Sequence, residues 1–117
     1  MYREVTILEG AARTASGTGD AFTGFGMAEK IGAAVVCSAR SGTNPTLDVI
    51  VQHSPDGTNW FDLITFTQLT AAGSEFKAIS EEQGTTVQAI GDRLRAKYTL
   101  GGTNPSFTFS VLLTAQD

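Results

Sequence analysis

The sequence has few charged residues and no excess of basic ones. Its 117 residues include 8 Lys and Arg against 12 Asp and Glu, which gives a formal net charge of −4 at pH 7. Proteins that bind a nucleic-acid backbone usually cluster Lys and Arg on one surface. Arg93, Arg95 and Lys97 alternate along one segment, and we interpret them as the solvated face of a strand. We therefore expect no nucleic-acid partner.

The chain also has a single cysteine and no long apolar run. Cys37 lies in the apolar stretch 31–37, where a free thiol usually behaves as a small buried hydrophobe. A catalytic thiol would need a histidine, and the only histidine, His53, lies on another segment. The first residues lack the apolar core of a secretory signal, and no run approaches the roughly 20 residues of a membrane span. We expect synthesis in the cytoplasm and no membrane partner.

What the sequence does have is a two-residue alternation of apolar and polar side chains, which is typical of strands with one face on a core. It is clearest over 106–114, and residues 93–100 alternate in the same way, so we predict a hairpin from these two segments. Residues 47–53 and 60–66 predict a second hairpin, because Ser54-Pro-Asp-Gly-Thr-Asn59 between them is rich in turn-forming residues.

Weaker alternation marks further strands. These are residues 4–8, 21–27, 33–39, 75–79 and 85–90. About eight short strands separated by turn signals predict an all-β fold, a single antiparallel β-sandwich of jelly-roll or immunoglobulin-like type, with one domain over residues 1–117. Residues 10–20 are small and polar, which predicts a surface loop or arm and a flexible N-terminal region.

A turn peptide occurs twice, as Gly42-Thr-Asn-Pro-Thr46 and Gly102-Thr-Asn-Pro-Ser106. Proline supplies no ladder donor, so each copy marks a strand boundary. The repeat indicates that residues 35–51 and 94–111 occupy related places, either in opposing sheets or as neighbours in one. Turn preference alone can also produce such a repeat.

The residues that usually carry chemistry do not form a recognisable motif. The acidic candidates fall at turns or on polar strand faces, where solubility and turn formation explain them; they are Asp48, Asp56, Asp62, Glu75 and Asp92. Asp56-Gly-Thr-Asn59 has the opening of a calcium loop without its remaining ligands. No phosphate-binding loop or nucleophile elbow is present. We predict that the protein is not an enzyme and uses no cofactor or metal.

Two features suggest contact with a partner. Trp60 follows the Asp-Gly turn, where a tryptophan is either a core anchor or an exposed platform for a sugar or a protein. Residues 1–20 are our candidate docking arm, because an extended segment can add a strand to the edge of a partner's sheet. Tyr2, Arg3, Val5 and Ile7 would then contact the partner.

Over roughly residues 31–115 the chain resembles small β-sandwich structural proteins encoded by tailed bacteriophages. The likeness rests on Leu47-Asp-Val-Ile-Val-Gln-His-Ser-Pro-Asp-Gly-Thr-Asn-Trp-Phe-Asp62, on Phe66-Thr-Gln68, and on the ending from Arg93-Leu-Arg95 to Phe107-Thr-Phe-Ser-Val111. The strand that ends in Gln-x-Ser-x-Asp-Gly-x-x-Trp is also similar to a hairpin of discoidin-like and other carbohydrate-binding sandwiches. Residues 1–30 lie outside the resemblance.

This resemblance implies a non-enzymatic virion protein, made in the host cytoplasm and located in the virion. The role it implies first is a head decoration or cement protein that binds the major capsid protein or other virion subunits. A neck or tail accessory protein is an alternative. The protein could also bind itself, as a trimer or another homo-oligomer. The hairpin around Trp60 keeps open a carbohydrate-binding or adhesin module on a virion or cell surface.

Overall fold

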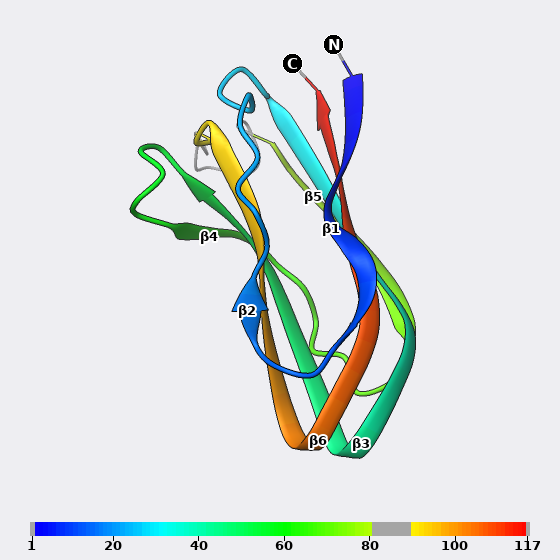
Figure 1. Ribbon diagram of the computed structural model, residues 1–117. Helices are drawn as coiled ribbons and strands as arrows, with labels where there is room; N and C mark the ends of the chain where they lie inside the picture. The colour runs from blue at the N-terminus through cyan, green and yellow to red at the C-terminus, as the bar shows by residue number, and fades with distance from the viewer. Residues whose placement is uncertain (1, 81–89, 117) are drawn as a thin grey trace.

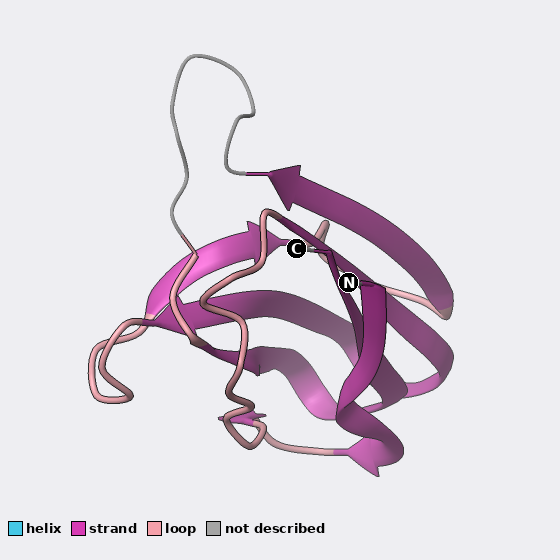
Figure 2. Ribbon diagram, turned by 90° about the horizontal axis from the view of Figure 1, so that it is seen from above, coloured by secondary structure: helices cyan, strands magenta, loops and turns pink. Residues whose placement is uncertain are grey.

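A computed structural model describes residues 2–80 and 90–116, and these residues form β-strands and no helix (Figures 1 and 2). The strands are β1 (Tyr2–Arg13), β2 (Gly17–Thr18), β3 (Lys30–Ser54), β4 (Phe61–Thr65), β5 (Gly73–Ser80) and β6 (Arg93–Gln116). Every pairing between them is antiparallel. The all-β prediction is confirmed. The described ranges hold six strands where we predicted about eight, because β3 and β6 each join two predicted segments.

The centre of the fold is a long ribbon of β3 and β6. The two strands pair from Lys30 opposite Gln116 to Ser54 opposite Arg93. A straight strand of the 25 residues of β3 would span about 80 Å, yet the molecule measures 41 × 26 × 25 Å. The ribbon is therefore bent back on itself, and Figure 1 shows both strands turning together at the bottom of the view.

The bend lies at the two copies of the turn peptide, with Thr43 opposite Thr103. Gly42 and Gly102 have φ angles of 113° and 97°, in the region that favours glycine. The repeat thus pairs with itself, and residues 35–51 and 94–111 are neighbours in one sheet. The predicted hairpin of 93–100 with 106–114 is wrong, because each part of β6 pairs with β3.

We call residues 30–41 with 106–116 the first half-ribbon, and residues 46–54 with 93–101 the second. The first is flanked by β1 on the β6 side and by β5 on the β3 side. The second is flanked by β4, which confirms the predicted hairpin of residues 47–53 with 60–66. On its β6 side lie β2 and an isolated bridge from Phe22 to Leu94, where we predicted a strand over 21–27. The predicted strand over 85–90 falls almost wholly outside the described residues.

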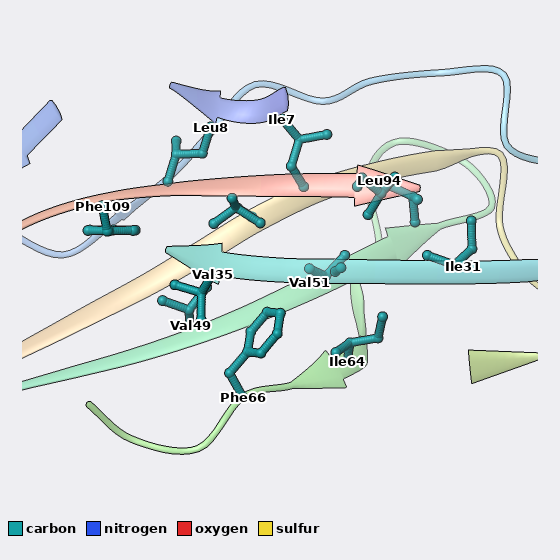
Figure 3. Close-up of a cluster of buried hydrophobic side chains, with 14 of the residues drawn as sticks. Ile7, Leu8, Ile31, Val35, Val49, Val51, Ile64, Phe66, Leu94 and Phe109 are labelled. Carbon is teal, nitrogen blue, oxygen red and sulfur yellow. The ribbon is translucent and has the colours of Figure 1, made fainter. Parts of the chain in front are cut away.

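The core lies between the two half-ribbons. Figure 3 shows Val35 of the first close to Val49 of the second, with Phe66 and Ile64 beside them. The inward set predicted from the alternation of the last strand is at most 1% exposed; it is Phe107, Phe109, Val111 and Leu113. Cys37 is buried among these apolar side chains. Removal of this apolar surface from water is the main force that holds the ribbon folded.

The N-terminal region that we predicted to be flexible is, over residues 2–13, strand β1. It pairs with β6 from Tyr2 opposite Gln116 to Arg13 opposite Phe107. Two causes hold it there. The backbone groups of β1 and of the β6 edge satisfy each other's hydrogen bonds, and the Ile7 and Leu8 side chains of β1 are buried. The small, polar composition of the following residues did not indicate this pairing.

Candidate functional site

The predicted N-terminal contact residues do not form one surface. Tyr2 is 60% exposed, but Ile7 is 2% exposed and belongs to the core, and Val5 packs against that core. The Arg3 guanidinium donates a hydrogen bond to Gly24 O and lies 4.3 Å from the centroid of the Phe25 ring. Of the four residues, Tyr2 presents a large apolar side chain to solvent. A docking role for this strand stays a prediction.

Trp60 is half-buried, and a cation covers one face of its ring. The Arg95 guanidinium carbon lies 4.2 Å from the centroid of the Trp60 ring, a cation–π contact. Trp60 immediately precedes β4, while Arg95 lies on β6, so β3 separates the two strands that hold this pair.

Gln52 links these two strands through hydrogen bonds. Arg95 Nε donates to Gln52 Oε1 at 3.0 Å, and Gln52 Nε2 donates to Asp62 Oδ1 at 2.9 Å. The register explains the contacts, because Gln52 lies opposite both Arg95 and Asp62. We call Gln52, Trp60, Asp62 and Arg95 the polar cluster. Gln52 is buried and its amide is hydrogen-bonded at both ends within the cluster, so the groups that can contact a hydroxyl-rich ligand are the Asp62 carboxylate, the Arg95 guanidinium and the Trp60 ring.

The turn after Ser54 holds Asp56 by its own backbone. Asp56 Oδ1 accepts from the N–H groups of Thr58 and Asn59 at 2.9 and 2.8 Å, and Oδ2 accepts from Asn59 Nδ2 at 2.7 Å. These hydrogen bonds hold the pKa of Asp56 far below its ordinary value. The carboxylate therefore serves to close the turn. Within residues 2–80 and 90–116, no three His, Cys, Asp or Glu side chains gather as they would around a metal ion.

The remaining nucleophile and base candidates make structural contacts. His53 Nδ1 accepts from the Gly91 N–H at 2.9 Å, and its ring packs edge-on to Phe61. Burial lowers the pKa of His53, which favours the neutral imidazole that this hydrogen bond requires. The Cys37 Sγ donates to the Ala39 carbonyl at 3.4 Å. Nothing in these contacts activates either group.

The structure also reveals an apolar outer face that our sequence reasoning missed. Val36, Phe76 and Leu112 are 42%, 62% and 41% exposed. They lie on three neighbouring strands, with Ala34 opposite both Phe76 and Leu112. We call these four residues the outer face. The alternation carried the signal for two of them, since Val36 and Leu112 are out of phase with the buried set.

Gly32 makes room for the Phe76 ring on this face. A Cβ at Gly32 would lie 2.6 Å from Phe76 Cζ, closer than atoms pack. The tip of the ring therefore lies over the glycine backbone.

A surface groove of about 490 Å³ runs between β1 and residues 19–22. Its basic side chain, Arg13, already donates hydrogen bonds to the carbonyls of Glu9, Ala11 and Phe109. The groove therefore has no uncommitted cation for an anionic ligand among the residues that line it. No helix long and apolar enough to cross a membrane occurs in the described part of the chain.

No family model matches this chain, and neither does any curated protein sequence. Among solved structures, it superposes on a chain of infectious bursal disease virus, Gx strain, with a TM-score of 0.60 and 15% identity over 98% of its length. The Gt strain gives a TM-score of 0.58 with 14% identity over 97%. The chain spans about a third of each viral chain, 31% and 32% respectively.

A more distant neighbour is a chain of the Clostridium thermocellum endo-1,4-beta-D-xylanase 10B CBM22-1-GH10 modules complexed with xylohexaose. Its TM-score is 0.46 at 10% identity, over 99% of this chain and 26% of that chain. At that score the match supports no argument. The two viral matches share the fold of this chain.

Proposed function

We propose that this chain is a non-enzymatic structural protein of a virion, most specifically a decoration or cement protein that binds the major capsid lattice. The observation that carries the proposal is the fold likeness to a virus chain, which extends over 98% of this chain with a TM-score of 0.60. It agrees with the resemblance of residues 31–115 to β-sandwich proteins of tailed bacteriophages. We infer that the folded ribbon is a β-sandwich of jelly-roll type, with one half-ribbon in each layer.

The contacts of the reactive side chains fit a structural role better than catalysis. An active site brings together a nucleophile or base, a group that orients it, and a cavity for substrate. Here His53 accepts a backbone hydrogen bond, and Asp56 closes a turn. A structural protein does not need such side chains to be available for chemistry. On a lattice, many weak contacts add up through avidity, so one copy needs only a small binding surface.

Tyr2 is the residue we expect to contact the capsid. It lies at the exposed start of β1, near the C-terminal end of β6 (Figure 1), and opposite Gln116. An exposed aromatic side chain at a strand end can fill a pocket on a neighbouring subunit. Arg3, Val5 and Ile7 would support it by holding the strand in place.

The test is co-sedimentation of the full chain with capsid shells from its source. We expect saturable binding that soluble sugars do not release. Removal of residues 1–20 would delete β1 and disturb the fold, so a loss of binding would not report on the contact alone. A point variant is therefore preferable. Tyr2→Ser should weaken binding about tenfold, the loss typical of a truncated interface aromatic. Met27→Ser is the matched control, since Met27 is 80% exposed.

Each contrary result has a distinct meaning. Absence of binding to shells contradicts the decoration role. Binding to purified neck or tail assemblies instead would make the protein an accessory of those parts. Release by soluble sugar would favour the carbohydrate-binding alternative.

The polar cluster supports that second candidate. Trp60 offers an aromatic surface beside Asp62, an arrangement suited to sugar hydroxyls, but the Arg95 contact already covers part of the ring. A sugar would have to displace the guanidinium or use the opposite side. Because Trp60 is the single tryptophan, titration with soluble oligosaccharides can be followed by its fluorescence. An unchanged emission spectrum at saturating sugar would eliminate this candidate.

A further inference from the structure

We propose that the edge of β5 that pairs with no other strand among residues 2–80 and 90–116 is a self-association surface, on which a second copy of this chain pairs its own β5 antiparallel and centred on Phe76. This goes beyond the virion role, because it names the partner and the contact. Three features of β5 support this pairing: its regular edge, its charge pattern and its exposed aromatic residue.

The β5 edge is regular along its whole length. Its eight residues pair with β3 from Ser80 opposite Lys30 to Gly73 opposite Cys37 without a register shift, and none is proline. The other described outer strands are less suitable. β1 has two register shifts, while β2 is two residues long and β4 is five. A long, regular strand with one unpaired side is a template for another strand.

The charges on β5 complement themselves. Antiparallel pairing centred on Phe76 places Glu75 opposite Lys77 of the second copy, and the twofold axis repeats the contact. Opposite charges directly across from each other stabilise a strand pair. A lone edge lysine discourages pairing, but the glutamate two residues before Lys77 turns that charge into half of an attractive pair.

Both charges remain available for a second copy. The Glu75 carboxylate accepts hydrogen bonds from the Thr67 N–H at 2.7 Å and from the Thr67 hydroxyl at 2.8 Å. Lys77 Nζ donates to the Thr65 carbonyl at 2.9 Å. These hydrogen-bond partners are neutral, and the Lys77 charge of the same chain is only a minor influence on the Glu75 carboxylate beside them.

The apolar outer face gives the pairing a further reason. Phe76 is 62% exposed and lies on the opposite side of β5 from Glu75 and Lys77. In the paired sheet the two Phe76 residues lie directly opposite each other, a position at which aromatic cross-strand pairs are favourable. Ser74 would face Ala78 of the second copy, and both side chains are small. The dimer would thus bury the most exposed part of the outer face.

The first test is sedimentation equilibrium of the full chain over a wide concentration range. We expect a monomer–dimer equilibrium. Glu75→Lys and Lys77→Glu should each raise the dissociation constant about tenfold, because each creates like-charge pairs at both symmetric contacts. The double variant Glu75→Lys/Lys77→Glu restores opposite charges and should return to within about threefold of the original value.

A second pair of variants guards against effects on folding, which thermal melting of each variant will report. Phe76→Ser removes an exposed side chain and should also weaken the dimer about tenfold. Met27→Ser, at an exposed apolar side chain outside β5, should leave it unchanged. If the charge variants do not fold, the comparison of Phe76→Ser with its control variant decides whether β5 forms the dimer contact.

The proposal is overturned if the chain is monomeric at all concentrations, including a case in which it binds capsid shells only as a monomer. It is also overturned if a dimer forms that neither the Phe76→Ser change nor the charge changes weaken, since the contact would then lie elsewhere. A double variant that stays as weak as the single ones would remove the charge argument and with it the proposed register.

Discussion

Asp92 shows how one exposed carboxylate can position a loop. Its Oδ1 accepts from the Gly26 N–H at 2.9 Å and its Oδ2 from the Gly24 N–H at 3.3 Å. Between these glycines, the Phe25 side chain is buried. The two backbone hydrogen bonds, with smaller contributions from the charges of Arg93 and Arg3, lower the pKa of Asp92. The ionised form therefore holds the loop over the core.

This lowered pKa makes the contribution of Asp92 to stability depend on pH. A carboxyl group whose pKa is lower in the folded than in the unfolded chain stabilises the fold above about pH 4, and this stabilisation is lost as the pH falls toward the folded-state pKa. We expect Asp92→Asn to lower the melting temperature at pH 7, and the gap from wild type to shrink as the pH falls below about 4.

Thermal melts at several pH values check this prediction. Asp20→Asn, at an exposed acid that shortly precedes the loop held by Asp92, is the control and should melt close to wild type. A gap for Asp92→Asn that stays constant down to pH 2 would mean that its effect does not come from the carboxylate charge.

Among the elements, the bend of the β3–β6 ribbon depends most on particular residues. A Cβ on Gly42 would lie 2.5 Å from Asn104 O, and one on Gly102 would lie 2.5 Å from Asn44 O. Because each glycine has no Cβ, the backbone of the opposite strand can lie close to it. Each glycine also has a positive φ. The two copies of the turn peptide are therefore needed together.

We expect Gly42→Ala to lower the free energy of unfolding by about 2 kcal/mol or more, through the left-handed backbone conformation and the clash with Asn104 O. Gly73→Ala is the matched control, because a Cβ there meets its nearest atom at 3.8 Å. It should change stability by less than about 0.5 kcal/mol. Urea denaturation midpoints measure both, and equal midpoints would contradict the role of the bend.

In the whole molecule, strands that are far apart in the sequence lie side by side in space. The ribbon joins residue 30 to residue 116, and the core forms between half-ribbons that both depend on this pairing. Such long-range contacts require closing large loops before any burial is gained. We expect refolding from urea in milliseconds to seconds, measured by stopped-flow fluorescence of Trp60. Refolding in microseconds would show that local contacts dominate instead.

Much of the local structure followed from the sequence alone. The alternation around Phe107 and Phe109 predicted which side chains are buried, and the Asp-Gly turn predicted the β3–β4 hairpin. The candidate site followed only in part. The sequence drew attention to Trp60, but not to its contact with Arg95, 35 positions away, because that contact depends on the order of three strands.

The alternation of side chains determines which face of a strand is apolar, since it depends only on residues two positions apart. Tertiary structure decided which strand lies beside which. It paired the two turn peptides across the ribbon, placed residues 2–13 along β6, and left Val36 and Phe76 exposed on one outer face. The physical reason is that backbone hydrogen bonds are the same for every residue, so partner and register are chosen by packing over the whole core.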